Sequence, residues 1–481
     1  MATTSQALLK PFERLKRLLQ IDKRDIVHVY LYALLNGLVN LSLPVGIQGI
    51  INLINGAQIS NSWVILVLFV LMGLALSGVF QLLQLRIVEN ISQRIFARAS
   101  FEFAYRFPRI RFDSLYNYHG PELANRFFDT LTIQKGLSKI LIDFSLASFQ
   151  ILAGLLVLSL YHPFFILFAI SLIGVAYMIL VLYGPKGLRT SLAESKYKYE
   201  VAHWLEEIAR TRLSFKLVDK PGIVLDKMDD NVNEYLQARE SHFQILINQY
   251  WSLLGFKIFI SAGLLIIGSL LVFSQQMNIG QFVAAEIIVL LIINSIEKLI
   301  QSLDSIYDVL TALEKIGYVA DMELDNEDGF SISDSNSIDF ELNNVTYSFP
   351  GEDKPVLNNL SFSISNKESV LLKGPDGSGK STLIKMLCGI IKPKAGSVLV
   401  NDINLNSIAL SSYRAKVGFV LGNNEIFEGS IYQNITLGRE GITLDDVQKA
   451  LNAVCLHEDL KKFQEGLHTV LDPAGRKIPE R

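Results

Sequence analysis

Six long apolar stretches dominate the first 303 positions of the chain. A helix needs about 20 such residues to cross a hydrocarbon core of ~30 Å, so each stretch is long enough to span a membrane. The stretches cover residues 26–54, 63–88, 137–160, 163–184, 250–274 and 279–303. The pattern predicts an all-α membrane domain of six helices over residues 25–320.

The basic residues between these stretches alternate along the chain. Segments 55–62, 161–162 and 275–280 contain no Lys or Arg, whereas the N-terminus and the second and fourth connections contain several. Cytoplasmic loops carry an excess of Lys and Arg. We therefore expect an integral protein of an inner or plasma membrane with both termini in the cytoplasm.

The second and fourth connections, residues 89–136 and 185–249, keep a helical spacing of apolar positions and contain few Gly or Pro. Structureless loops of this length are uncommon in compact domains. We expect the membrane helices to continue into the cytoplasm as rods. One pair of rods is predicted to reverse near Gly120 and Pro121.

The N-terminal segment, residues 1–24, contains an amphipathic pattern. One face of residues 11–21 carries Phe12, Leu15, Leu18 and Leu19, and Arg14 and Arg17 lie elsewhere. This arrangement is typical of a helix at a membrane surface. An ordinary solvated helix is the alternative.

A few ionisable residues lie inside the apolar stretches, namely Asp143, Lys257, Glu286, Glu297 and Lys298. Such groups are costly in a bilayer, so they usually pair, face the bundle interior or mark a pathway. Antiparallel packing of the last two stretches places Lys257 and Glu297 at similar depth, where a structural ion pair and a substrate role both stay open. Glu286 lies nearer the outer face and is a candidate for the transport route.

The pattern changes after residue 320. Residues 321–337 are acidic and weakly hydrophobic, which indicates a link between domains. From residue 338 onward short strand-like and helix-like segments alternate, including strands at 344–349 and 361–364. This part of the chain therefore predicts an α/β domain.

A phosphate-binding pattern lies in this second domain. It consists of Gly374, Pro375, Asp376, Gly377, Ser378, Gly379, Lys380, Ser381 and Thr382. The glycines let backbone N–H groups point at phosphate oxygens, Lys380 adds a positive charge, and Ser381 offers a hydroxyl to Mg²⁺. Residues 369–373 are typical of a buried strand, and helical spacing follows the loop, so the anion would face a helix N-terminus. An ordinary glycine turn is the alternative, but the context favours binding of ATP with Mg²⁺.

Composition supports a membrane protein. Half of the 481 residues are hydrophobic, and the mean hydropathy is +0.32, which is too apolar for a soluble protein. The net charge of −3 provides no global field that would attract nucleic acid. We expect the lipid bilayer, and no nucleic acid, as a partner.

Six spans with long helical inner connections ahead of a phosphate loop resemble the ATP-binding cassette (ABC) exporter family in its half-transporter arrangement. Residues 113–126 resemble the first coupling turn of that family, and residues 206–216 resemble its second coupling helix. Phe349 is similar in position to the aromatic residue that stacks on adenine, with core packing of Phe349 and Tyr347 as the alternative. The resemblance implies ATP-driven export of an unidentified substrate by two half-transporters, as a homodimer or a heterodimer.

The sequence departs from the family at two places. Gly422 stands where the family has a glutamine that contacts Mg²⁺, and Asn423 or Asn424 is the candidate substitute. The family's signature, Walker B residues and switch histidine are not found before Arg481, so no catalytic residue is assigned.

Residues 338–481 are therefore expected to form a C-terminally incomplete nucleotide-binding domain. We favour a truncated sequence, because a sheet without its later strands would expose apolar edges. The alternative is a non-hydrolysing ATP-binding subunit that regulates the other half of a heterodimer, and Gly422 and residues 478–481 are its main support.

Overall fold

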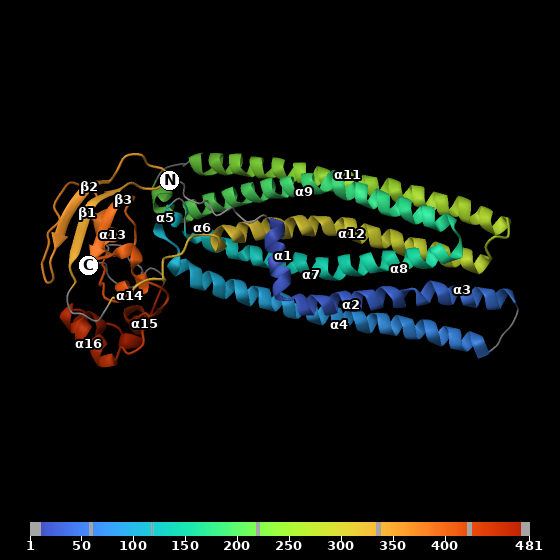
Figure 1. Ribbon diagram of the computed structural model, residues 1–481, viewed down its shortest axis with the longest axis horizontal. Helices are drawn as coiled ribbons and strands as arrows, with labels where there is room; N and C mark the ends of the chain where they lie inside the picture. The colour runs from blue at the N-terminus through green and yellow to red at the C-terminus, as the bar shows by residue number, and fades with distance from the viewer. Residues whose placement is uncertain are drawn as a thin grey trace.

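The computed structural model of the chain describes residues 11–56, 61–116, 118, 120–217, 222–332, 338–420 and 426–472. A long helical bundle forms most of the molecule, and a smaller part that contains the strands lies at one end (Figure 1). Six described helical segments are long and apolar enough to cross a membrane. The predicted order of a six-helix membrane domain followed by an α/β domain is confirmed.

The six segments coincide with the six apolar stretches. They are formed by α2 (Lys23–Asn40) with α3 (Ser42–Asn55), α4 (Asn61–Arg106), α6 (Gly120–Asn125) with α7 (Asp129–Lys139) and α8 (Ser145–Tyr161), α9 (Phe164–Arg210), α11 (Gly222–Phe273), and α12 (Ile279–Ala320). The first segment is divided at Leu41. Pro44 follows in the first turn of α3, where a missing N–H costs no intrahelical hydrogen bond.

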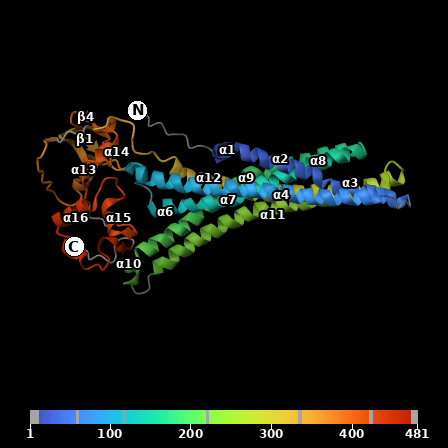
Figure 2. The same ribbon diagram turned by 90° about the horizontal axis from the view of Figure 1, so that it is seen from below.

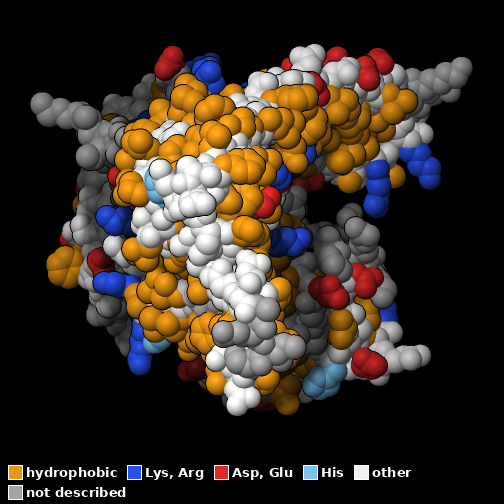
Figure 3. All heavy atoms as spheres, turned by 90° about the vertical axis from the view of Figure 1, so that its right-hand side faces the viewer, with side chains coloured by type: hydrophobic (Ala, Val, Ile, Leu, Met, Phe, Trp, Pro, Cys, Tyr) orange, Lys and Arg blue, Asp and Glu red, His pale blue; other side chains and the backbone are white. Residues whose placement is uncertain are grey.

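Helix α12 lies at the centre of the bundle. Half of its apolar window is buried, compared with 11–33% for the other five segments. Its isoleucines pack with side chains of α8, α9 and α11 in the main hydrophobic core. Hydrophobic side chains also cover much of the outer surface of the bundle, seen end-on in Figure 3, as a bilayer-facing surface requires.

The membrane helices continue beyond the apolar stretches as long helical rods. After α4 the chain reverses through η1 (Phe107–Arg109) and α5 (Phe112–Leu115), so the reversal comes slightly before Gly120, which begins α6. The other pair of rods, α9 and α11, is joined through α10 (Arg212–Lys216). The ends of α9 and α11 nearest the strand-containing part diverge from α4 and α7 (Figure 2).

The N-terminal helix α1 (Pro11–Ile21) crosses the long helices at a steep angle (Figure 1). Leu15, Leu18 and Leu19 pack against a buried cluster from α2, α4, α7 and α12. Phe12 is 61% exposed. The predicted helix forms, but its apolar face is divided between the protein and the surroundings.

The strand-containing part is built on a four-stranded sheet in the order β2–β1–β3–β4. Strand β1 (Phe340–Tyr347) pairs antiparallel with β2 (Leu357–Ile364) and β3 (Ala395–Val400), and β3 pairs with β4 (Ile403–Asn404). One core joins this sheet to α13 (Lys380–Leu387) and α14 (Leu410–Arg414). The remaining elements are η4 (Leu405–Ser407), β5 (Gly429–Ser430), α15 (Ile431–Thr436), α16 (Leu444–Ala453), α17 (His457–Leu460), η5 (Gly466–His468) and β6 (Val470–Leu471).

Residues 369–373 do not form the buried strand that the sequence predicts. No described strand includes them, and Val370 and Leu371 are 50% and 75% exposed. An apolar run is buried on both faces only when helices and neighbouring strands cover it. No strand within the described ranges pairs with this run.

The described part of the acidic link makes specific contacts. The backbone N–H of Arg111 donates to Glu323 O at 2.9 Å, and Arg414 Nη1 donates to Asp325 Oδ2 at 2.5 Å. Arg14 of α1 pairs with Asp321 at 2.5 Å. These contacts connect the link to the residue that precedes α5, to α14 and to α1.

Candidate nucleotide site and its contacts with the membrane helices

The phosphate loop runs directly into α13, which begins at Lys380, so the last three residues of the motif form the first turn of the helix. Gly377 and Gly379 have φ angles of +78° and +88°, a left-handed conformation that glycine adopts without strain. A Cβ at Gly379 would also lie 3.1 Å from Val356 O. Both glycines are therefore required by the backbone path that brings the loop to the helix N-terminus.

Lys380 folds back over the loop. Its Nζ donates to Gly374 O and Pro375 O at 2.8 Å each. Residues 374–378 and Ser381 are exposed, whereas Gly379 and Thr382 are buried. The loop thus places the Lys380 ammonium group and the exposed hydroxyl residues Ser378 and Ser381 at a helix N-terminus, which is an arrangement suited to a phosphate with Mg²⁺.

Phe349 lies just beyond β1 and stacks on Tyr116, which follows α5. The two ring centroids are 4.8 Å apart, with 12° between the ring planes. Tyr347 meets Phe349 edge-on at 5.4 Å. Phe349 is therefore in contact with the first coupling turn, and its stacking on adenine stays a prediction.

Two further contacts join α5 to the α/β part. The Tyr347 hydroxyl donates to Asp113 Oδ1 at 3.0 Å, and Lys385 Nζ of α13 lies 4.9 Å from the ring centre of Phe112. Burial, and then the charge of Asp113, raise the pKa of Tyr347, so its hydroxyl remains a donor at neutral pH. The helix that begins at the phosphate loop thus touches the turn between two membrane helices.

The resemblance located the coupling turn at residues 113–126 but did not identify Tyr116 as a contact of Phe349. The sequence signal available for this contact was that Tyr116 is an aromatic residue in a turn expected to face the α/β domain. The positions of Gly422, Asn423 and Asn424, and residues 473–481, lie outside the described residues.

The structure brings two of the intramembrane charges together. Lys257 Nζ of α11 lies 3.5 Å from Glu297 Oε2 of α12, with the two side chains 41% and 24% exposed. Glu286 is partly buried on α12, about three turns from Glu297. The ion pair favours the structural interpretation of Lys257 and Glu297, and the transport role of Glu286 stays a prediction.

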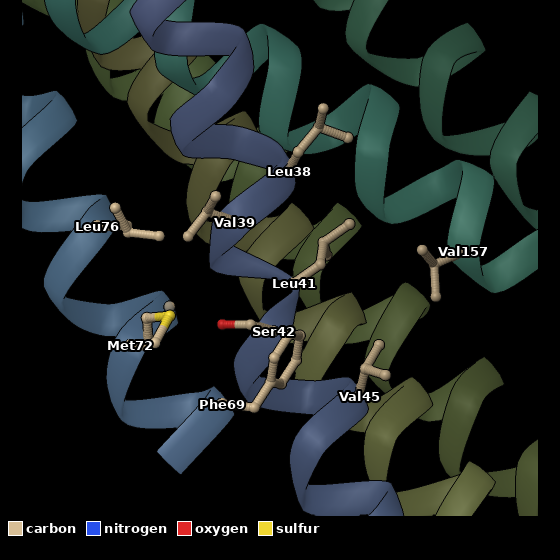
Figure 4. A pocket seen from close by; sticks show the side chains of 10 residues that line it. Leu38, Val39, Leu41, Ser42, Val45, Phe69, Met72, Leu76 and Val157 are labelled. Atoms are coloured by element: carbon tan, nitrogen blue, oxygen red, sulfur yellow. The ribbon is translucent and has the colours of Figure 1, made fainter. Parts of the chain in front are cut away.

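A cavity of about 460 Å³ lies among α2, α3, α4 and α8, within the apolar part of the bundle. Figure 4 shows apolar side chains around it and the hydroxyl of Ser42 directed toward Met72 of α4. Ser42 Oγ has no hydrogen-bond partner among the described residues. Sequence reasoning missed this cavity because its walls are ordinary residues of apolar stretches.

Two family descriptions match the chain. Residues 27–296 match the ABC transporter transmembrane region, and residues 357–470 match the ABC transporter family. The fold is similar to a bacterial Atm1-family ABC exporter with ATP bound, with a TM-score of 0.73 and 18% identity over 95% of this chain and 81% of that one.

Curated relatives match over shorter regions. The uncharacterized ABC transporter ATP-binding protein YfiB of Bacillus subtilis is 32% identical over 162 residues, which are 34% of this chain and 28% of that protein. The colicin V secretion/processing ATP-binding protein CvaB of Escherichia coli is 28% identical over 214 residues, which are 44% of this chain and 31% of that protein. The aligned regions thus span about a third of these relatives.

The transmembrane match alone, residues 27–296, covers more than half of the 481 residues and is followed by the match to the ATP-binding part. The chain therefore belongs to the ABC transporter family and has the half-transporter architecture of its exporters.

Proposed function

We propose that this chain is a subunit of a dimeric, ATP-driven exporter with its membrane domain at residues 25–320, a link at 321–337 and its nucleotide-binding domain from 338. Both termini face the cytoplasm of an inner or plasma membrane in this proposal. The observation that carries it is the junction of the phosphate loop, through α13 and β1, with the turn between α4 and α6. That junction joins an ATP site to two membrane helices.

ATP binds in this proposal with its phosphates at residues 374–382. Loop N–H groups and the N-terminus of α13 face the phosphate oxygens, Lys380 neutralises part of their charge, and Ser381 ligates Mg²⁺. Lys380 must leave its two carbonyl acceptors to do so. Those acceptors are Gly374 O and Pro375 O, each 2.8 Å from the Lys380 Nζ.

Movement of α13 and β1 is passed to the membrane helices through α5. The contacts of Lys385 with Phe112, of Tyr347 with Asp113 and of Phe349 with Tyr116 supply three separate points of attachment. A rigid shift of the nucleotide-binding domain would therefore pull on α4 and α6 together.

The second coupling region supports a dimer. The tip formed by α10 and its flanking residues exposes a group of apolar side chains, with Leu213 at 67%, Leu217 at 87%, Ile223 at 61% and Leu225 at 74%. Such a cluster on a cytoplasmic tip marks a protein contact. We assign that contact to a second half-transporter, identical or different.

A second candidate function is that of an ATP-binding subunit that does not hydrolyse its nucleotide. Gly422 favours it, because glycine has no side chain to contact Mg²⁺. Phosphoryl transfer depends on positioned metal ligands and a group that orients the attacking water. This candidate predicts tight binding of ATP without turnover.

The test is ATP hydrolysis by the purified assembly in liposomes, with the parent chain compared with Lys380→Ala. Removal of the loop cation should lower the rate by at least about a hundredfold, since it removes a charge contact made to the transferring phosphate. Lys449→Ala, at an exposed position of α16, is the matched control and should leave the rate unchanged. Equal rates for the parent and Lys380→Ala would reject this site as the motor.

A further inference from the structure

Helix α13 begins in the phosphate loop, and its other end is held by two side chains of α14. The Tyr413 hydroxyl donates to Leu387 O, and Arg414 Nη2 donates to Gly389 O at 2.7 Å. Burial raises the pKa of Tyr413, so its hydroxyl stays a donor at neutral pH. Carbonyl groups at the C-terminus of a helix lack intrahelical partners and carry partial negative charge, so a hydroxyl and a guanidinium group suit this position. Arg414 therefore caps the end of α13 that lies opposite the phosphate loop.

The same guanidinium group binds the link between the two domains. Arg414 Nη1 donates to Asp325 Oδ2 at 2.5 Å, and the Asp325 side chain is only 8% exposed. A pair shielded from water in this way is screened less than one on an open surface. A guanidinium group is planar and holds its donors in fixed directions. Because one rigid group contacts both partners, a displacement of the end of α13 relative to Asp325 must stretch one of the two hydrogen bonds.

The backbone of Asp325 is paired with the segment that follows α4. Asp325 N donates to Arg109 O at 2.7 Å, and Arg111 N donates to Glu323 O at 2.9 Å. One buried hydrophobic cluster contains side chains from the ends of both α4 and α12. Asp325 therefore lies where the link meets the ends of these two membrane helices.

The surroundings of Asp325 leave its carboxylate to Arg414. The guanidinium group of the neighbouring Arg111 pairs with Glu323 and Asp113 instead. Residues 321–339 join α12 to β1, and a link of that length can absorb a movement of the domain unless it is fixed. Leu410 N donates to Asn326 O at 3.2 Å, which keeps the link beside α14. The pair of Arg414 with Asp325 then joins the link to the end of α13.

We propose that Arg414 is a positioning residue that transmits movement of α13 through Asp325 to the ends of α4 and α12. Displacement of α13 moves the guanidinium group, and the paired carboxylate carries residues 323–325 with it. This inference rests on the proposed function, because it requires ATP at the phosphate loop to displace α13. It adds a second route to the α5 contacts, which involve Lys385, Tyr347 and Phe349 instead.

The experiment is hydrogen–deuterium exchange mass spectrometry of the reconstituted assembly with and without ATP and Mg²⁺. Protection of residues 374–382 by ATP reports binding, and a change in residues 321–327 reports transmission through Asp325. In the parent we expect ATP to slow exchange in the loop and to change exchange in residues 321–327 by at least about threefold.

Arg414→Gln and Asp325→Asn should each keep the ATP protection of the phosphate loop, because neither residue lies in it. Each should reduce the ATP-dependent change in residues 321–327 by at least about half, since the hydrogen bond between two charged groups is lost or weakened. A merely structural role would alter exchange of the link with and without ATP alike and would leave the difference intact. Asp325→Asn preserves the shape of the side chain and leaves α13 and α14 unchanged, so it tests the route even if Arg414→Gln does not fold.

Lys449→Gln is the matched control. It removes an exposed ion pair with Asp445 in α16, outside this route, and should keep both ATP effects of the parent. Loop protection without any change in residues 321–327 of the parent, or an equal change in Asp325→Asn, would overturn the route through Arg414 and leave the proposed function standing. Absence of loop protection in the parent would overturn the proposed function and this inference with it.

Discussion

Phe349 and Tyr116 illustrate how single residues connect the nucleotide site to the membrane helices. An aromatic ring has two faces, and Tyr116 occupies one face of Phe349 at 4.8 Å. Stacking on the base and stacking on the coupling turn are therefore compatible only on opposite faces. Stacking on adenine requires Phe349 alone, whereas contact with the coupling turn requires both Phe349 and Tyr116.

If Phe349 also stacks on adenine, Phe349→Ala should lower the affinity for ATP about threefold to tenfold, which is the usual worth of an aromatic stack. Tyr116→Leu should leave the affinity within about twofold, because it removes only the contact with the coupling turn. Titration with a fluorescent ATP analogue measures both. Unchanged affinity in Phe349→Ala would restrict this ring to core and coupling contacts.

Lys257 and Glu297 allow a structural ion pair to be separated from a substrate site. Removal of one partner leaves an unpaired charge in an apolar region, whereas removal of both does not. Lys257→Met and Glu297→Gln should each lower the Tm of the purified protein, and the double variant should recover part of the loss. If the double variant loses as much Tm as the two single variants added together, the ion pair contributes little to stability.

The membrane helices show how far sequence reasoning reaches at the scale of elements. The six apolar stretches were enough to predict the membrane helices, because a membrane helix satisfies its own backbone hydrogen bonds and needs only length and apolarity. The division of the first span at Leu41 was missed, although a sequence signal was present: Pro44 cannot donate a hydrogen bond to the carbonyl of Asn40, the last residue of α2. A strand depends on partners from elsewhere in the chain, so the apolarity of residues 369–373 could not by itself predict their exposure.

The same limit applies to the candidate site. The phosphate loop was predictable because all its chemistry lies within nine consecutive residues, from Gly374 to Thr382. The contact of Phe349 with Tyr116 joins positions 233 residues apart, and only the fold brings them together. Likewise, the acidic composition of residues 321–337 did not indicate that Glu323 and Asp325 would bond to Arg111 and Arg414.

The short element α5 should respond to a change in β1. Tyr347→Phe removes one hydrogen bond to Asp113 and should raise amide hydrogen exchange in residues 110–116 by up to about tenfold. Tyr432→Phe in α15 is the control, because its hydroxyl donates to Ile442 O at 3.5 Å and the change also removes one hydrogen bond, but outside residues 110–116. Equal exchange in the parent and in Tyr347→Phe would mean that this bond does not hold α5.

At the scale of the whole molecule, the divergence of α9 and α11 from α4 and α7 suggests which parts move (Figure 2). The nucleotide-binding domain touches α5, at the end of the α4 rod, whereas the apolar tip at α10 is exposed. If this subunit couples ATP to export, we expect the distance between the α4 rod and the rod that ends at the α10 tip to change. We therefore predict that α9 and α11 move relative to α4 and α7 within one chain, whether the partner is an identical or a different half-transporter.

That movement can be measured directly by pulsed electron–electron double resonance between spin labels on Gln93→Cys of α4 and Asp230→Cys of α11, with Cys388 and Cys455 replaced by Ser. Both labelled positions are exposed. We predict that ATP with Mg²⁺ shifts the distance distribution in the reconstituted assembly, and that Lys380→Ala abolishes the shift. A distribution that ATP leaves unchanged in the parent, or shifts equally in Lys380→Ala, would contradict the claim that nucleotide at this loop drives the membrane helices.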